Sequence, residues 1–121
     1  MLSLLSPFGP KVAAITPTDA MHRVADGSLM LVDIRDITEL KTTGHATGAA
    51  HIPLTVFRMK ADPSSPECHP KLSVDKPVAL YCASGARSKM AAKMLMQMGY
   101  REVYNMGALH HWQMAGGSIT H

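Results

Sequence analysis

This chain of 121 residues lacks the sequence features that are typical of disulfide-rich, membrane-spanning and zinc-binding proteins. It has two cysteines, Cys68 and Cys82, which are too few for a disulfide framework and fit a reducing compartment, so we expect a cytoplasmic protein. A membrane helix needs about 20 apolar residues in a row, and no stretch approaches that length. His45 and His51 have no Cys, Asp or Glu at zinc-ligand spacing, so we expect structural hydrogen bonds there, with no metal and no other cofactor.

Charged residues are also sparse, at 17% of the chain, with a formal net charge of +3. The lysines and arginines are scattered and do not form a stripe with interleaved aromatic residues. We therefore expect neither a nucleic-acid nor a membrane partner. A modest positive field suits a small anionic ligand.

The hydrophobic fraction of 46% is enough for 121 residues to bury one core, with residues 1–10 as a loose N-terminal arm. Strand and helix signals alternate along the chain, which predicts an α/β fold with a mainly parallel sheet and helices on both faces. The predicted strands are 29–34, 49–52, 77–81 and 102–105. The predicted helices are 17–26, 37–42, one that ends at Gly99, and 108–114, and residues 61–71 form a surface loop.

Residues 78–88 contain an arrangement that favours a reactive thiol. An apolar run ends at Cys82, and a short loop of small residues then opens a helix. The N–H groups of such a loop converge on the sulfur, and the helix N-terminus adds about half a positive charge, so the pKa of the thiol falls below its usual value of about 8.5. Arg87 brings a guanidinium fork that can hold an oxyanion beside the thiolate. Cys82 is therefore a candidate nucleophile, and the alternative is a buried cysteine that only packs.

The spacing between Cys82 and Arg87 separates two chemistries. Cysteine enzymes that transfer phosphate use a Cys-x5-Arg loop, which seats a tetrahedral phosphate on its amides, whereas this chain has Cys-x4-Arg. The smaller ring of amides suits one terminal sulfur atom better than a phosphate group. Sulfur transfer is the favoured interpretation, and a phosphatase or arsenate reductase is the less favoured one.

Four blocks carry a family resemblance: residues 31–36 (LVDIRD), residues 44–53 (GHATGAAHIP), the Cys82 loop with the helix behind it, and residues 103–108 (VYNMGA) followed by 112–116 (WQMAG). In this order and at these spacings they resemble the single-domain rhodaneses, a family of thiosulfate sulfurtransferases. The resemblance covers nearly the whole chain. It implies one rhodanese-like domain over residues 1–121 with a five-stranded sheet.

The resemblance also implies covalent sulfur transfer without a catalytic histidine. The Cys82 thiolate would take the outer sulfur of thiosulfate or of a polysulfide, and cyanide or a thiol would then accept it from the persulfide. The N–H groups of the loop would bind the donor and stabilise the persulfide; its residues are Ala83, Ser84, Gly85, Ala86, Arg87 and Ser88. Many relatives that use thiosulfate have arginine directly after the nucleophile, where this chain has Ala83. The alternative function is therefore a relay that receives its sulfur from a partner protein.

Other residues allow a functional and a structural interpretation. Asp33 and Arg35 either support the site or form an ion pair that clamps a strand end to a neighbouring loop, and we favour the ion pair. Cys68 either resolves a persulfide on Cys82 or is a surface thiol, which we favour because no helix or glycine loop activates it. Trp112 is expected in the core. The helix behind the loop is predicted to bury the face formed by Met90, Met94, Leu95 and Met98.

Overall fold

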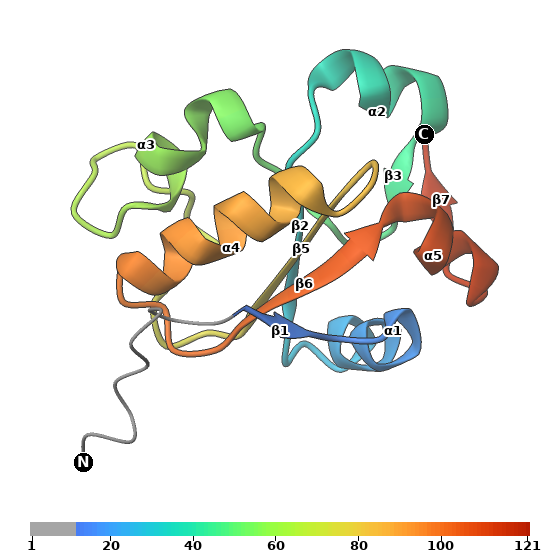
Figure 1. Ribbon diagram of the computed structural model, residues 1–121, viewed down its shortest axis with the longest axis horizontal. Coiled ribbons are helices and arrows are strands. Elements are labelled where there is room, and N and C mark those ends of the chain that lie inside the picture. Colours follow the sequence, from blue (N-terminus) through green and yellow to red (C-terminus); the bar gives the residue numbers. More distant parts are fainter. Residues whose placement is uncertain (1–11) are drawn as a thin grey trace.

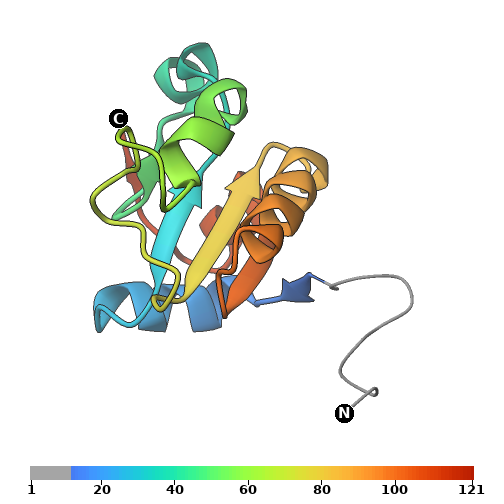
Figure 2. The same ribbon diagram turned by 90° about the vertical axis from the view of Figure 1, so that its left-hand side faces the viewer.

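The central sheet of the protein has five parallel strands. The computed structural model describes residues 12–121, and the arm expected at residues 1–10 lies outside them. The strand order is β1 (Ala13–Ala14), β6 (Val103–Ala108), β5 (Val78–Cys82), β2 (Met30–Asp33) and β4 (Ala50–His51). A separate antiparallel pair joins β3 (His45–Ala46) to β7 (Ile119–Thr120). Figure 2 shows β2 (cyan) and β5 (yellow) side by side, with their carboxyl ends at the same edge of the sheet.

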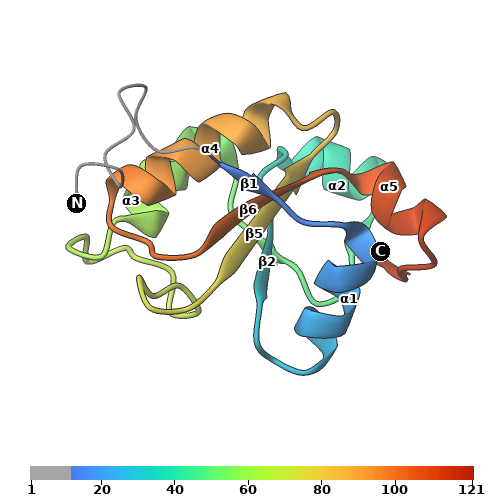
Figure 3. The same ribbon diagram turned by 60° about the horizontal axis from the view of Figure 1, so that its bottom comes forward.

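Helices cover both faces of this sheet, which confirms the predicted α/β architecture. The helices α3 (Phe57–Ala61) and α4 (Ala86–Gln97) lie on one face, and α1 (Pro17–Ala25) and α5 (Leu109–Met114) lie on the other (Figures 1 and 3). The helix α2 (Ile37–Thr43) stands at the carboxyl edge, and the 3-10 turn η2 (Leu54–Val56) leads into α3. None of the helices described over residues 12–121 has the length and apolar character needed to cross a membrane.

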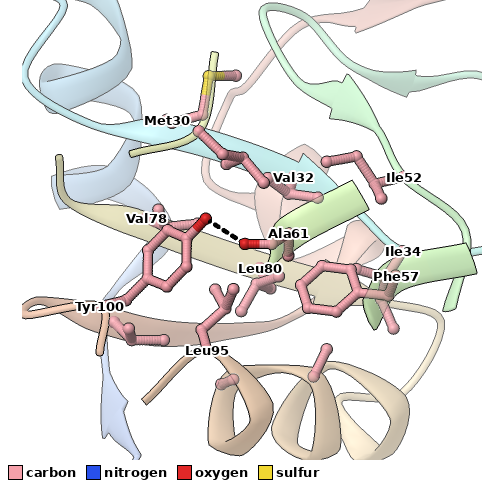
Figure 4. Packing of buried hydrophobic residues seen from close by; sticks show 14 of the residues in the cluster. Met30, Val32, Ile34, Ile52, Phe57, Ala61, Val78, Leu80, Leu95 and Tyr100 are labelled. Atoms are coloured by element: carbon pink, nitrogen blue, oxygen red, sulfur yellow. Dashed lines mark hydrogen bonds between the residues drawn. The ribbon is translucent and has the colours of Figure 1, made fainter. Parts of the chain in front are cut away.

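Alternate side chains of β2 and β5 enter different cores, because successive residues of a strand project to opposite sides. Val32 and Leu80 pack with Leu95 in the core under α3 and α4 (Figure 4). Tyr81 belongs to the second core, under α1 and α5, and Cys82 returns to the α4 side. This alternation places the sulfur of Cys82 beneath α4.

The structure changes the bounds of several predicted elements, and β2 and β4 are shorter than the predicted strands 29–34 and 49–52. β6 runs to Ala108 instead of ending at residue 105, and its register against β5 shifts between Leu80 and Tyr81. The elements β1, η2, α3, β3 and β7 have only two to five residues each. Segments this short show no periodicity, so the sequence pattern does not reveal them.

The prediction for the buried face of α4 is wrong in part. Met90 is 59% exposed, and the buried positions are Ser88, Ala91, Ala92 and Leu95. The helix packs against both β5 and β6, and small side chains at three of these four positions let it lie close to the sheet. Trp112 of α5 is buried in the core on the other face of the sheet, as expected.

Candidate active site

Cys82 ends β5 at the carboxyl edge of the sheet, where ligands bind in open α/β folds. The residue is fully buried. Its Sγ accepts hydrogen bonds from the N–H of Gly85 at 3.0 Å and from the N–H of Ser88 at 3.4 Å, and the Oγ of Ser88 also lies 3.4 Å away. The sulfur therefore lies against the first turn of α4.

The turn around the sulfur depends on a left-handed backbone at Gly85. This residue is the N-cap of α4 and has a φ of +97°, which residues with a side chain disfavour. A Cβ at this position would also lie 3.3 Å from the Cα of Gly107 in β6. Ala83, Ser84 and Ala86 are exposed around Gly85. Residues 82–88 thus form one compact turn with no charged side chain before Arg87.

Burial raises the pKa of the Cys82 thiol, but hydrogen bonds from the loop lower this pKa by more, so the net shift is downward. The groups that lower it are the side chain of Ser88 and the backbone N–H groups of Ser88, Ser84 and Gly85. The backbone N–H groups donate to the charged form of the sulfur and so favour ionisation. The Ser88 hydroxyl has one proton, and it favours ionisation when that proton turns to the sulfur. Because the thiolate is the nucleophilic form, the loop increases the fraction of reactive sulfur near neutral pH.

We expect Ser88→Ala to raise the pKa of Cys82, since the substitution removes the hydroxyl and leaves the backbone donors in place. Thiolate absorbance in the ultraviolet, followed against pH, measures this pKa, with Cys82→Ser protein as the blank. The midpoint should move to higher pH while the thermal unfolding curve still shows a folded protein. A midpoint that stays in place or falls would mean that the hydroxyl does not stabilise the thiolate.

Asn105 of β6 anchors the sulfur-binding turn from the neighbouring strand. Its Nδ2 donates to the carbonyl of Gly85 at 3.1 Å. Its Oδ1 accepts from the Ser88 hydroxyl at 2.7 Å and from the N–H of Gly107 at 3.0 Å. One carboxamide thus holds both the glycine cap and the first turn of α4. The only signal for Asn105 in the sequence is its position at the end of a predicted strand.

The guanidinium of Arg87 is paired with Glu39 of α2. Its Nη1 and Nη2 lie 2.7 and 2.8 Å from the Oε1 and Oε2 of Glu39, a two-pronged contact. Hydrogen bonding to Glu39 raises the pKa of Arg87, and the same contact lowers the pKa of Glu39. The sequence predicts that the Arg87 guanidinium binds an oxyanion of the ligand, but in the structure it binds the carboxylate of Glu39. Sequence reasoning missed Glu39, because 48 residues separate it from Arg87.

Asp33 and Arg35 form a buried ion pair, with 2.7 Å between the Nη2 of Arg35 and the Oδ2 of Asp33. Arg35 also donates to the Oγ1 of Thr43 at 2.8 Å and to the carbonyl of Gly44 at 2.7 Å. These contacts clamp the end of β2 to the end of α2. Asp33 follows the strand alternation onto the face opposite Cys82, so the contacts support the structural interpretation of this pair.

Cys68 and Cys82 lie at opposite ends of α4. Cys68 is close enough to Tyr100, just beyond the C-terminal end of the helix, to influence the titration of its hydroxyl, whereas Cys82 contacts the first turn. With 12 residues, α4 is about 18 Å long. The sulfur of Cys68 contacts the carbonyl of His69 within its own segment, and its role as a surface thiol stays a prediction.

The histidines and the acidic residues show no metal centre in the part of the chain that the structure describes. No three His, Cys, Asp or Glu side chains of residues 12–121 gather closely enough to hold a metal ion. The Nε2 of His51 lies 2.6 Å from the carbonyl of Arg35, which is the structural hydrogen bond expected for this residue.

Comparison with known proteins agrees with this architecture. The family model described as Rhodanese-like domain matches residues 16–115. The uncharacterized Bacillus subtilis protein YqhL is 33% identical over 105 residues, which cover 86% of this chain and 74% of YqhL. YrkF, a Bacillus subtilis protein named for a proposed role as a sulfur carrier, is 32% identical over 68% of this chain but only 40% of its own length.

Solved structures give the same result for the fold. A Rhodopseudomonas palustris protein of unknown function, described as a possible tyrosine phosphatase, matches with a TM-score of 0.80 and 33% identity over 90% of this chain and 85% of that one. A human single-domain sulfurtransferase matches with a TM-score of 0.73 over 88% of this chain and 99% of that one. Its identity is 19%, so this likeness shows a shared fold only.

Proposed function

The chain belongs to the family of rhodanese-like domains, and we propose on this basis that it transfers sulfane sulfur through a persulfide on Cys82. The observation that carries the proposal is the pair of backbone N–H groups, from Gly85 and Ser88, that converge on one sulfur atom. Donors placed in this way stabilise a sulfur anion and need no side-chain base. The short loop between Cys82 and Arg87 favours a single sulfur atom over a phosphate group.

The proposed reaction has two steps. In the first, the Cys82 thiolate attacks the outer sulfur of the donor, a bond forms between Sγ and that sulfur, and the donor's S–S bond breaks. With thiosulfate, sulfite leaves with the bonding electron pair and Cys82 becomes a persulfide. In the second, cyanide or a thiolate attacks the outer sulfur of the persulfide and restores the Cys82 thiolate, with thiocyanate or a new persulfide as product.

The relatives and the cysteine content support this proposal. YrkF carries a name that refers to sulfur transport, and it shares 32% of its aligned residues with this chain. Cys68 and Cys82 are both free thiols, and the nucleophile has to remain reduced to react. We therefore assign the proposed activity to the cytoplasm.

A protein-to-protein sulfur relay is the second candidate function. Ala83 is the observation that favours it, because a cation directly after the nucleophile would help to bind the thiosulfate dianion and none is present there. In a relay the donor would be a persulfide on a partner protein. Turnover of thiosulfate would then be slow and incidental.

Steady-state kinetics with thiosulfate and cyanide test the enzymatic function. We expect saturable formation of thiocyanate with parallel double-reciprocal lines, because the two substrates react in separate half-reactions. Sulfur loading of Cys82 from a persulfide, without thiosulfate turnover, would support the relay. Failure of Cys82 to load from any sulfur donor, combined with hydrolysis of an aryl phosphate, would reject sulfur transfer in favour of phosphate chemistry.

A further inference from the structure

We propose that Glu39 determines which sulfur donors the site accepts. By neutralising Arg87, it favours donors that carry at most one negative charge, such as small organic persulfides, over the thiosulfate dianion. This inference rests on the proposed sulfur transfer and goes further by naming the charge class of the donor.

The pair between Arg87 and Glu39 uses both terminal nitrogens of the guanidinium. The side chains are 35% and 28% exposed, so water screens the pair less than it would screen a fully exposed one. An incoming oxyanion that used the same two nitrogens would have to displace the carboxylate. A planar, two-pronged contact is the strongest arrangement that arginine makes with a carboxylate, so this displacement is costly.

Glu39 is held in place by its own helix. Its Oε1 accepts from the N–H of Asp36 at 3.2 Å, and the Oδ1 of Asp36 accepts from the N–H of Glu39 at 3.0 Å. This capping box fixes the start of α2 at the carboxyl edge of the sheet. The carboxylate that meets Arg87 is therefore a fixed part of the site.

The charges around the loop disfavour the binding of a dianion. Glu39 contacts Arg87 directly, and the Cys82 thiolate and the carboxylate of Asp36 also act on this guanidinium and raise its pKa. Ala83 contributes no charge. Lys89 comes two residues after Arg87, and two residues correspond to a rotation of about 200° around a helix, so Lys89 lies on the opposite side of α4. There it lines a cleft with Asn105 and residues of β1. The positive contributions next to the sulfur then come mainly from the loop N–H groups and the end of α4.

A small organic persulfide suits these charges. The Cys82 thiolate attacks the terminal sulfur of R–S–SH, the bond between Sγ and that sulfur forms, and the donor's S–S bond breaks. The donor leaves as the thiolate RS⁻ with the bonding electrons, and the proton remains on the transferred sulfur. No dianion has to approach Glu39 at any step.

Removal of the Glu39 charge tests the inference. The variant Glu39→Gln keeps the shape of the side chain and leaves Arg87 with an uncharged partner. The matched control is Glu67→Gln, which changes the net charge by the same amount in an exposed pair with Lys60, remote from the loop. Loading of Cys82 is measured for each protein with thiosulfate and with 2-hydroxyethyl persulfide as donors.

We expect Glu39→Gln to raise kcat/KM for thiosulfate about tenfold, mainly through a lower KM, because one unit of repulsion is removed from the path of a dianion. With the persulfide the same variant should change kcat/KM by less than about twofold, and Glu67→Gln should leave both donors within that range. An equal effect on the two donors, or a loss with thiosulfate alone, would overturn the role of Glu39. Failure of the unaltered protein to load from either donor would instead reject the proposed sulfur transfer.

The salt dependence of the unaltered protein gives a second test, which does not require the variant to fold. If the rim of the site repels dianions, added potassium chloride should accelerate loading by thiosulfate, because salt screens repulsion. If Arg87 attracts the donor, added salt should slow this step. Slower loading with rising salt would contradict the inference.

Discussion

Cys82→Ser is expected to abolish sulfur transfer, with the rate of thiocyanate formation lowered at least about a thousandfold. The serine hydroxyl remains protonated at neutral pH and forms no persulfide, so the loop N–H groups have no sulfur anion to stabilise. Serine is close to cysteine in size, and donors already surround this position, so the free energy of unfolding should change by less than about 1 kcal/mol. Thiocyanate formation and thermal unfolding, measured on the same preparation, separate the chemical loss from a folding defect.

Cys68→Ser is the matched control for this loss. It also removes one thiol, but from the segment after α3, where the sulfur contacts the carbonyl of His69. We expect this variant to retain full activity. Residual transfer in Cys82→Ser protein that disappears when Cys68 is also replaced would contradict the assignment of Cys82 as the sole sulfur carrier.

Asp33→Asn is expected to lower the free energy of unfolding by about 3–5 kcal/mol, because it leaves the buried Arg35 guanidinium without a counter-charge. Asp33 is 0% exposed and Arg35 is 2% exposed, so water cannot take over the role of the carboxylate. Arg35 also joins β2 to Thr43 and Gly44, so the loss should loosen the edge of the sheet on which the Cys82 loop is built. Equilibrium unfolding in urea measures the change.

Two further variants separate burial from charge in this experiment. Asp75→Asn breaks the pair with Arg101, whose side chains are 69% and 78% exposed, and should cost less than about 0.5 kcal/mol. Adding Arg35→Met to Asp33→Asn removes the unpaired guanidinium and should recover part of the stability. A loss below about 1 kcal/mol for Asp33→Asn alone would show that this pair is not a major support of the fold.

The sequence predicts the layered fold because its main elements carry strong local signals. The continuous apolar run that contains β2 indicates a strand buried on both faces, and Thr16 with Pro17 marks the start of α1, where the Oγ1 of Thr16 accepts from the N–H of Asp19 at 3.1 Å. For Met90 the sequence pattern predicts burial, but the side chain is exposed. Helical periodicity finds an apolar stripe, but the face that packs is decided by how closely α4 approaches the sheet, and Ala91 and Ala92 meet that requirement.

One part of the candidate site is made of consecutive residues, and the other part is made of residues that lie far away in the sequence. The turn that includes Cys82, Gly85 and Ser88 lies within seven consecutive residues, so the sequence alone points to it. Glu39 and Asn105 come from other elements, and only the folded chain brings them to this turn. The charge of Arg87 is visible in the sequence, but its neutralisation by Glu39 is not.

The mass of the intact protein after incubation with a sulfur donor tests the central claim most directly. Thiosulfate and 2-hydroxyethyl persulfide are used in parallel, and peptide mapping locates any added atom. We predict one additional sulfur atom on Cys82, none on Cys68, and its removal by cyanide with one equivalent of thiocyanate released. A Cys82 that takes up no sulfur from either donor would contradict the assignment of this loop to sulfur transfer.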